Sequence, residues 1–148
     1  MSYTIIDRVA TIAEHRHVAE LVGWEDSFRW EAMPGSLAGS CCGTVILDET
    51  DSIVAMGRVV GDGAFFFYVQ DVAVHPHHRH QGLGTTLMHR LRAQVTALAG
   101  GTAFVGLFST PEAEQLYQST GFGSRPGLTG MWQLLADGDP ASRIPRKE

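Results

Sequence analysis

"VAVHPHHRHQGLGTTLMHRL", residues 72–91, joins an apolar run to a glycine loop and then to a regular apolar repeat. The leucines of the repeat stand at 83, 87 and 91, and the same spacing continues until two glycines at 100 and 101. Leucine at every fourth position predicts a helix from residue 82 to about residue 98, ended by glycine. The β-branched run before His75 predicts a strand. The stretch therefore indicates a strand, a tight loop and a helix.

Gly82 and Gly84 lie where this helix is expected to begin. The first turn of a helix offers unpaired N–H groups and the positive end of the helix dipole, and both suit a pyrophosphate. Glycine leaves room for phosphate oxygens to approach the backbone. A Walker loop would need Gly-Lys-Ser/Thr, and a dinucleotide fingerprint would need a third glycine with a later acidic residue. The sequence has neither pattern.

Upstream of this stretch, the sequence predicts three antiparallel strands within residues 44–76, joined by polar turns at about 48–52 and 61–63. The letters "TIAE" at residues 11–14 fit a capping box, which predicts a helix over about 12–22. Residues 23–40 lack a clean period and are expected to form a loop with one or two short helical turns.

Downstream of the helix, "TAFVGLFS" predicts a strand, "STPEAEQLYQST" a short helix and "GMWQLL" a closing strand at 130–135. No repeat or linker interrupts the chain, so residues 1–136 are expected to form a single domain. The remaining residues, 137–148, are polar and contain proline, and we expect this tail to fray.

Composition restricts the class of protein. A chain of 148 residues that is 44% hydrophobic suits one domain with a sizeable core. The net charge of −5 and the absence of a basic stripe argue against nucleic acid as a partner. The first residues lack a secretory pattern and no apolar run is long enough to cross a bilayer, so we expect a cytoplasmic protein without a membrane partner. Cys41 and Cys42 are adjacent, which favours free thiols.

Four of the seven histidines fall within residues 75–80, which raises the question of a metal site. Metal ligands must converge on one ion, whereas neighbouring loop residues splay apart, and no cysteine or carboxylate is close in sequence. We therefore expect no metal. Two other hypotheses remain: the histidines are solvent-exposed loop residues, or they assist phosphate binding more strongly as they become protonated.

The string "VAVHPHHRHQGLGTTLM", with Arg79 spaced as Arg-x-x-Gly-x-Gly, resembles the acetyl-CoA loop of the GCN5-related N-acetyltransferase (GNAT) superfamily. A second block, "EAEQLYQSTGF", is similar to the later motif of the same superfamily. Together the two blocks imply that residues 3–135 adopt the α/β (α+β) fold of this superfamily, a mixed, mostly antiparallel central sheet flanked by about four helices. They also imply transfer of an acetyl group from acetyl-CoA to an amine.

The resemblance implies a cofactor site in the loop and the strand before it. Its candidate residues are Val72, Ala73, Val74, Arg79, His80, Gln81, Gly82, Leu83, Gly84, Thr85 and Thr110. The backbone of the first three would pair with the pantetheine arm like an added strand. The chain departs from the family pattern at His80, where a small glycine is usual, at Gln81, where a basic residue is common, and at Thr110, where an asparagine is common.

Direct attack of an amine on a thioester requires a base for the amine proton and an acid for the departing thiolate. The resemblance implies Tyr117 as the acid, and packing is the alternative role for this residue. Gln70 holds the position at which some relatives carry a carboxylate. Asp71 is a candidate base, although alternation along a strand would turn it to the other face. A water chain, Glu25 or Glu31 are equal candidates.

Relatives build the acceptor pocket from the loop that corresponds to "GWEDSFRWEAMP" in this chain. Its candidate residues here are Trp24, Glu25, Phe28, Trp30 and Glu31, which would hold an amine by cation–π contact and ion pairing. The alternative is that these are lid and core aromatics. The "FFFY" run at 65–68 is expected to be a core strand. A small-molecule primary amine is the favoured acceptor. A protein or peptide acceptor, a non-catalytic acyl-CoA sensor and a homodimer remain open.

Overall fold

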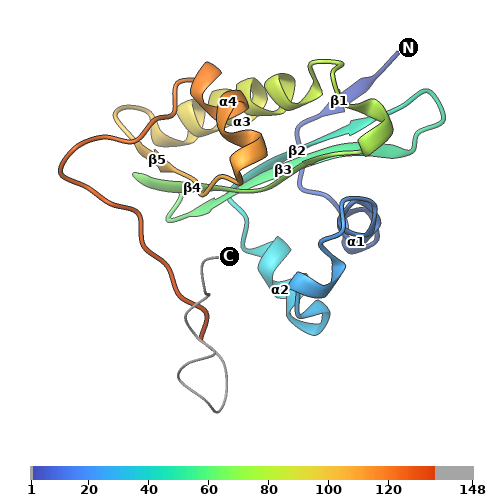
Figure 1. The fold of residues 1–148 in the computed structure, drawn as a ribbon, viewed down its shortest axis with the longest axis horizontal. Helices are drawn as coiled ribbons and strands as arrows, with labels where there is room; N and C mark the ends of the chain where they lie inside the picture. The colour runs from blue at the N-terminus through green and yellow to red at the C-terminus, as the bar shows by residue number, and fades with distance from the viewer. Residues whose placement is uncertain (1, 136–148) are drawn as a thin grey trace.

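The computed structural model describes residues 2–135 as one mixed sheet with helices on both faces (Figure 1). The sheet order is β1-β2-β3-β4-β5, antiparallel except for the parallel pair of β4 and β5. The strands are β1 (Thr4–Ile6), β2 (Cys42–Leu47), β3 (Ile53–Gly61), β4 (Phe66–Val74) and β5 (Phe104–Gly106). The α-helices are α1 (Ile12–Leu21), α2 (Met33–Ala38), α3 (Leu83–Ala99) and α4 (Glu114–Ser119). The 3₁₀ turns are η1 (Glu25–Ser27), η2 (Trp30–Ala32), η3 (Pro76–His78) and η4 (Pro111–Ala113).

The expected α+β class, with a mostly antiparallel sheet and about four helices, is confirmed. The helix at 12–22, the three central strands, the long helix, the strand after it and the short helix all form. Strand β1 was not expected, because three residues carry too little alternation to be recognised. No helix among the described residues is long and apolar enough to span a bilayer. The tail at 137–148 lies outside the described residues.

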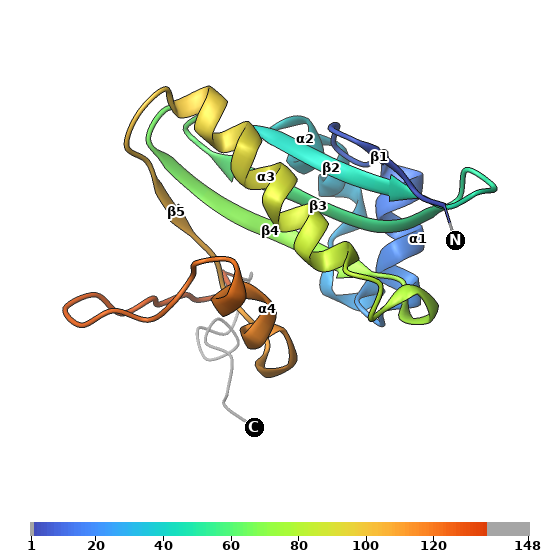
Figure 2. The ribbon, with the colours of Figure 1, turned by 90° about the horizontal axis from the view of Figure 1, so that it is seen from above.

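The closing strand expected at 130–135 is wrong: these residues form no ladder with the sheet. Their composition suits a strand, but a strand also needs a neighbour, and the segment runs away from β5 (Figures 1 and 2). The "FFFY" prediction is also wrong in part. Phe67 is fully buried in the cluster with α3, whereas Phe65, Phe66 and Tyr68 are 44%, 48% and 38% exposed. Phe66 and Tyr68 alternate with Phe67 along the strand and therefore face the other side of the sheet.

Helix α3 lies along one face of the sheet, across β2, β3 and β4 (Figure 2). The three leucines that predicted it, at 83, 87 and 91, are all buried. Helices α1 and α2 cover the opposite face (Figure 1). Helix α1 begins with the expected capping box: Glu14 N–H donates to the Thr11 hydroxyl, and Thr11 N–H donates to the Glu14 carboxylate.

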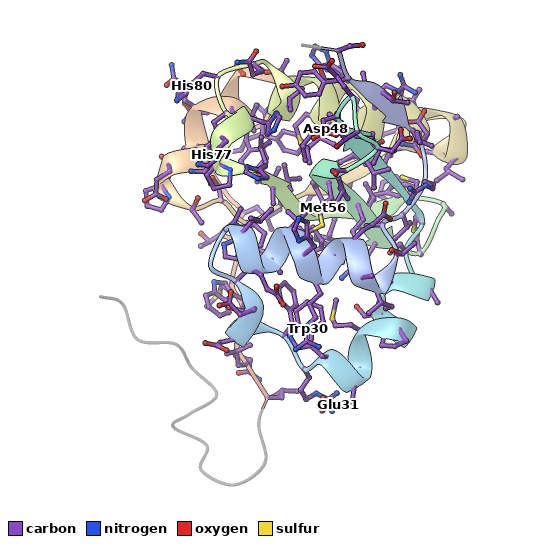
Figure 3. The ribbon with its side chains drawn as sticks, turned by 90° about the vertical axis from the view of Figure 1, so that its right-hand side faces the viewer. Trp30, Glu31, Asp48, Met56, His77 and His80 are labelled. Carbon is purple, nitrogen blue, oxygen red and sulfur yellow. The ribbon has the colours of Figure 1, made fainter. Side chains whose placement is uncertain are left out.

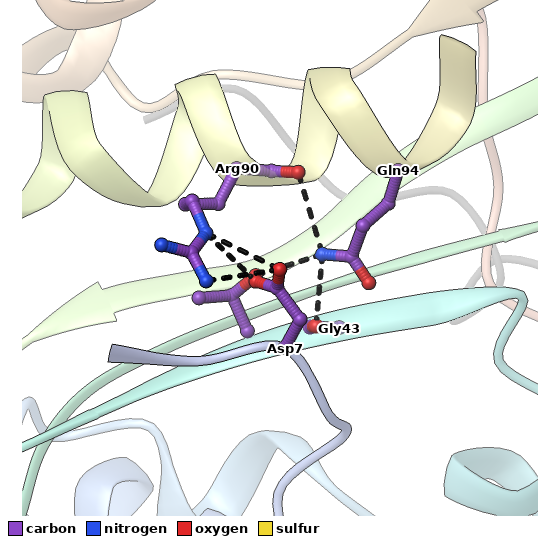
Figure 4. Close-up of polar contacts among 5 residues, drawn as sticks. Asp7, Gly43, Arg90 and Gln94 are labelled. Carbon is purple, nitrogen blue, oxygen red and sulfur yellow. Dashed lines mark hydrogen bonds and ion pairs between the residues drawn. The ribbon is translucent and has the colours of Figure 1, made fainter. Parts of the chain in front are cut away.

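A polar cluster fastens α3 to the first two strands (Figure 4). The Asp7 carboxylate accepts hydrogen bonds from Arg90 and from the Thr44 hydroxyl, each with a contact of 3.0 Å. Gln94 Nε2 donates to the carbonyl of Gly43 at 3.0 Å and to Thr44 Oγ1 at 2.9 Å. The hydrogen bond from Arg90 holds the pKa of Asp7 below its ordinary value, although burial opposes this. The cluster sets the position of α3 along the sheet.

Cys41 and Cys42 are free thiols, as expected, at the start of β2. Burial, followed by the nearby Cys41 and Asp7, raises the pKa of the Cys42 thiol to about 11. A thiol reacts as its thiolate, so this shift favours a packing role for Cys42 over a catalytic one.

A β-bulge in β4 bends the strand in its second half. Ala55 pairs with Val74 and Met56 with Ala73, but Arg58 pairs with Gln70, so one extra residue is inserted opposite Gly57. Asp71 carries the strain of the bulge, with a φ of 57°. Aspartate enters this left-handed region more readily than most residues, since its short polar side chain bonds locally.

The carboxylate of Asp71 is the centre of a buried polar network. Arg58 Nε donates to Asp71 Oδ2 at 2.8 Å, and His15 Nε2 lies 3.0 Å from the same oxygen. Arg58 also donates to the carbonyl and hydroxyl of Ser36 in α2 and to the hydroxyl of Ser40. Burial alone would raise the pKa of Asp71, but the hydrogen bonds from His15 and Arg58 and the Arg58 charge lower it overall.

We predict that Asp71→Asn lowers the free energy of unfolding by about 3–5 kcal/mol at neutral pH, because it leaves Arg58 buried without a countercharge. Since the pKa of Asp71 is lowered in the folded state, its contribution is complete above about pH 4 and is lost as the pH falls through the folded value. The difference between the two proteins should therefore shrink in acid. Urea titrations at a series of pH values measure it.

The matched control is Asp26→Asn, which removes an exposed carboxylate from the loop after α1. Its unfolding free energy should stay within about 0.5 kcal/mol of the parent at every pH. An equally small effect of Asp71→Asn would show that the network contributes little to stability.

Candidate functional site

Strands β4 and β5 are paired at one end only, which leaves a fork in the sheet. The parallel ladder joins Phe66, Phe67 and Tyr68 to residues 104–106 and stops there. Beyond Tyr68, β4 continues to Val74 and pairs only with β3 among the described residues. The bulge lies in this second half and bends it. The backbone of residues 69–74 therefore presents a free strand edge, to which an extended ligand can hydrogen-bond.

The loop after β4 delivers the chain to the start of α3 with two residues in the left-handed region. His80 has a φ of 63°, and Gly82, the residue that precedes the helix, has a φ of 77°. His80 thus adopts the conformation that a glycine would take at the same position. The first bond of the helix runs from Thr86 N–H to the Gly82 carbonyl at 3.0 Å. The N–H groups of residues 83–85 precede it and point out of the helix end, where an anion can bind.

Gly84 has a second reason to lack a side chain. A Cβ at this position would lie 3.0 Å from Leu116 Cδ2 of α4, a distance at which the leucine must move. A Cβ at Gly82 would meet nothing within 4 Å, so Gly82 is needed for its backbone conformation instead. Gly84 therefore allows α4, which carries Tyr117, to pack against the first turn of α3.

Three of the loop histidines lie close together: the His75 ring is 5.3 Å from the His77 ring and 5.1 Å from the His78 ring, centroid to centroid. His75 accepts a hydrogen bond from His77 N–H through Nδ1, and His78 Nδ1 lies 2.9 Å from the Tyr3 hydroxyl. His77 and His80 are exposed on the outside of the loop (Figure 3). Burial, and then the neighbouring His78 and His77, lower the pKa of His75. Among residues 2–135, no group of three or more His, Cys, Asp or Glu could hold a metal ion.

The other candidate cofactor residues lie around the fork and the loop. Arg79, Gln81 and Thr85 are exposed, and Leu83 is buried beneath the loop. Thr110 is exposed at the start of η4, past the open end of β5, and its hydroxyl makes no cap hydrogen bond. The expected cofactor residues thus come from three parts of the chain: the second half of β4, the loop with the first turn of α3, and the start of η4.

Tyr117 is 9% exposed and packs in the apolar cluster that includes Phe67 and Val69 of β4. Its ring meets Phe122 edge-on at 6.3 Å. Burial raises the pKa of its phenol, so the hydroxyl keeps its proton at neutral pH. The position suits a proton donor beside the fork, and it is equally that of a packed aromatic residue.

The candidate acceptor loop is partly a closed aromatic cluster beneath the sheet. The rings of His15, Phe28 and Trp30 contact one another at 5.0–5.7 Å. Trp30 donates from Nε1 to the Glu25 carbonyl, and the Arg16 guanidinium already covers its ring at 4.9 Å. Figure 3 shows Trp30 below α1.

The remaining loop residues take different positions. Trp24 packs against the core cluster around Val18 and Met56. Glu31 points into solvent, with its side chain 72% exposed beside Arg29 (Figure 3). Glu25 is half-buried, and among the described residues its Oε2 is buried without a hydrogen-bond partner. A buried carboxylate oxygen without a partner is costly, so Glu25 is the loop residue best prepared for a cation.

His15 and Arg58 were missed by the sequence analysis. His15 is 1% exposed, and its Nδ1 also lacks a partner among residues 2–135. The available signal was its place on the apolar stripe of α1, between Ile12 and Ala19, which predicts a buried position. Alternation along β4 is expected to turn Asp71 to the face opposite Gln70, but the bulge interrupts this alternation. Asp71 bonds to His15 of α1, whereas Val69 and Val72 pack in the cluster that includes α3.

Comparisons with known proteins agree with this geometry. An acetyltransferase (GNAT) domain family matches residues 40–123. "GCN5-related N-acetyltransferase 1, chloroplastic" of Arabidopsis thaliana is 35% identical over 85 residues, which cover 57% of this chain and 42% of that protein. "Serotonin N-acetyltransferase 2, chloroplastic" of Oryza sativa subsp. japonica is 36% identical over 79 residues, 53% and 38% of the two chains. The matches thus span less than half of these curated relatives.

Solved structures resemble the whole fold. A GNAT-family acetyltransferase of Streptococcus pneumoniae is 29% identical with a TM-score of 0.72, over 88% of this chain and 96% of the other. A protein of meticillin-resistant Staphylococcus aureus shares the fold with a TM-score of 0.78 at 23% identity, over 88% and 98% of the two chains. The family match covers more than half of the sequence and includes the loop and Tyr117, so the chain belongs to the GNAT superfamily of acetyltransferases.

Proposed function

We propose that this protein is an N-acetyltransferase that moves an acetyl group from acetyl-CoA to the primary amine of a small molecule. The single observation that carries the proposal is the fork between β4 and β5, which opens beside the first turn of α3. A free strand edge and a set of unpaired N–H groups suit, in turn, the amide-rich arm and the pyrophosphate of CoA. When bound, acetyl-CoA supplies the activated acetyl group.

In this proposal each part of the chain has one task. The backbone of Val72, Ala73 and Val74 pairs with the pantetheine arm, and the N–H groups of residues 81–85 bind the pyrophosphate. Arg79 and the exposed loop histidines lie nearby to add positive charge. Tyr117 gives its proton to the departing sulfur. Asp71 is held by Arg58 and His15, and its lowered pKa makes it a weaker base, so here it supports the bend in β4.

The acceptor is proposed to be a small amine bound below the sheet, beside the loop after α1. The half-buried Glu25 carboxylate has an oxygen free to pair with an ammonium group, and Phe28 offers an aromatic wall. The cluster is closed by ring contacts rather than open as a groove, and this favours a small ligand over a polypeptide. Relatives named for both classes exist: one bears the name serotonin N-acetyltransferase 2 and another histone acetyltransferase TAP1.

The test is an acetyl-transfer screen in which the purified chain receives acetyl-CoA and single acceptors, and thiol release is followed. The acceptors should include polyamines, arylalkylamines, aminoglycosides, amino acids and lysine-containing peptides. We expect turnover with a small amine, and slower turnover of the same amine by the Glu25→Gln variant. Turnover with peptides alone would show that the acceptor is a polypeptide and not a small amine. CoA binding without any turnover would identify a non-catalytic sensor.

We predict that Gly84→Val weakens CoA binding by pushing α4 away from the loop as well as by narrowing the anion site. The two causes can be separated because the new side chain meets Leu116. In Gly84→Ala the clash should reduce CoA affinity, and the double variant Gly84→Ala/Leu116→Ala should recover most of it. Calorimetric titration of CoA measures both. Unchanged affinity in Gly84→Val would remove the loop from the proposed site.

We predict that Tyr117→Phe lowers kcat by about 10²–10⁴-fold, the range typical of general-acid catalysis, with little effect on CoA affinity. The ring and its packing against Phe122 remain in this variant, so the fold should be preserved. Tyr68→Phe is the matched control, because it removes an exposed phenol from β4. A loss of less than about threefold, with an unchanged pH profile, would leave Tyr117 as a packing residue.

A further inference from the structure

The imidazole of His15 is held by a carboxylate at one nitrogen and is unbonded at the other. Its Nε2 lies 3.0 Å from Asp71 Oδ2, and its Nδ1 is buried without a hydrogen-bond partner among residues 2–135. Because the pKa of Asp71 is lowered, its carboxylate is ionised at neutral pH and can only accept. The hydrogen in this contact therefore belongs to His15 Nε2. A neutral imidazole then carries its lone pair on Nδ1, which makes this atom a proton acceptor.

The carboxylate that holds His15 is itself fixed in place. Arg58 Nε donates to the same Asp71 oxygen at 2.8 Å, and the Arg58 guanidinium is held in turn by the hydroxyls of Ser36 and Ser40. A fixed carboxylate on one imidazole nitrogen sets the tautomer and stabilises the imidazolium that forms when the other nitrogen takes a proton. The pair of Asp71 and His15 thus has the arrangement of a histidine general base.

His15 lies on the α1 side of the free part of β4. Its partner Asp71 belongs to residues 69–74, the part of β4 that β5 leaves unpaired. Helix α1, which carries His15, covers the face of the sheet opposite α3 (Figure 1). Tyr117 packs with Val69 in the cluster that includes α3. The candidate acid and His15 therefore lie on opposite faces of the sheet, with the free part of β4 between them.

The rings of Phe28 and Trp30 cover the imidazole. They meet it edge-on, with centroids 5.0 and 5.7 Å away, and leave His15 1% exposed. Both rings are half-buried and belong to residues 24–32, which form two 3₁₀ turns without side-chain caps. Hydrogen bonds of 3₁₀ turns have poorer geometry than those of an α-helix. The Trp30 indole N–H bonds to the Glu25 carbonyl within the same segment, so the segment can shift from His15 without breaking this bond.

A second buried atom without a partner borders the same aromatic cluster. Among the described residues, Glu25 Oε2 is buried and makes no hydrogen bond. The charged groups on the elements that pack around the imidazole are Asp71 of β4, Arg58 of β3, Glu25 of η1 and, over the Trp30 ring, Arg16 of α1. Helix α2 carries no charged residue. Since Asp71 and Arg58 balance each other, Glu25 is the negative charge left to balance a proton on Nδ1.

We propose that His15 is the general base of the acetyl transfer, a role that rests on the proposed function. Asp71 and Arg58 position its imidazole, and residues 24–32 cover it until the amine binds. The acceptor ammonium gives one proton to Nδ1, and the freed nitrogen lone pair attacks the thioester carbonyl. The C–N bond forms and the C–S bond breaks; the sulfur takes the phenol proton of Tyr117, and a second amine proton restores the phenol. The proton on His15 passes to solvent, and it is the one proton that the whole reaction releases.

The first test is His15→Gln, assayed with the amine of highest kcat/KM in the acceptor screen. The glutamine amide keeps an N–H donor for Asp71 but cannot take up a proton, so the urea midpoint should stay close to that of the parent. We expect kcat to fall by about 10²–10⁴-fold. The parent should also lose activity in acid as the imidazole takes a proton from solvent, and the variant should lack this limb of the pH profile.

The matched control is His17→Gln, which removes an exposed histidine from the same helix and should leave kcat and the pH profile unchanged. With an active parent, a loss of less than about threefold in His15→Gln and an unchanged pH profile would overturn the role of His15 and leave the proposed function standing. A parent that turns over no amine would overturn the proposed function, and the role of His15 with it.

A second test needs no substitution and decides the matter if His15→Gln does not fold. The ¹⁵N resonances of the His15 imidazole, assigned through its contacts with Phe28 and Trp30, report which nitrogen carries the hydrogen. At neutral pH we expect the hydrogen on Nε2 and a bare Nδ1. Addition of the same amine should shift the Nδ1 resonance and leave those of His17 in place. A hydrogen on Nδ1, or an Nδ1 resonance that the amine does not move, would overturn the inference.

Discussion

The contact between Asp71 and Arg58 is the constraint on which most of this structure depends. Two charged groups are buried between the sheet and the α1–α2 layer. They are tolerated there because each bonds to the other and to a further polar partner, His15 for Asp71 and Ser36 for Arg58. Asp71 is also the residue in the left-handed region that forms the bulge. The same carboxylate therefore anchors two helices and bends β4 where its edge is free.

The bend matters because parallel neighbours would otherwise continue side by side. Strand β4 is long enough to pair with a partner along its whole length, yet it pairs with β5 over three residues only. The free part of β4 and the first turn of α3 are then adjacent in sequence as well as in space, joined by a loop in which His80 and Gly82 make the turns. A ligand with an amide chain and a diphosphate meets two kinds of backbone donor in one place.

Local patterns predicted most elements, and non-local relations account for the failures. The leucine spacing of α3 and the capping box of α1 each involve residues close together in the chain, so the sequence was sufficient to predict both helices. The bulge at Asp71 depends on Arg58 and His15, which are distant in sequence, and no motif marks it. The exposed Phe65 and Phe66 were expected in the core because apolar composition does not reveal whether a helix covers that face of the strand. The strand expected at 130–135 failed for the same reason: its composition suits a strand but does not show which strand it would pair with.

Within the candidate site, the loop was predictable and the chemistry around it less so. Two glycines at a strand–helix junction can be recognised from the local sequence, and Gly82 and Gly84 do lie at the start of α3. The packing of Gly84 against Leu116 of α4 is visible only in the structure. The buried His15 was recognisable only from its place on the apolar stripe. Glu25 and Glu31 are alike in sequence, and the structure separates them by burial.

The half-buried thiol of Cys42, at the start of β2, has a consequence for redox chemistry. With a pKa of about 11, Cys42 is a thiolate in roughly one molecule in ten thousand at neutral pH. In the proposed reaction, CoA leaves as a free thiol, which forms a disulfide when it oxidises. Thiol–disulfide exchange requires an attacking thiolate, so Cys42 resists capture as a mixed disulfide with CoA.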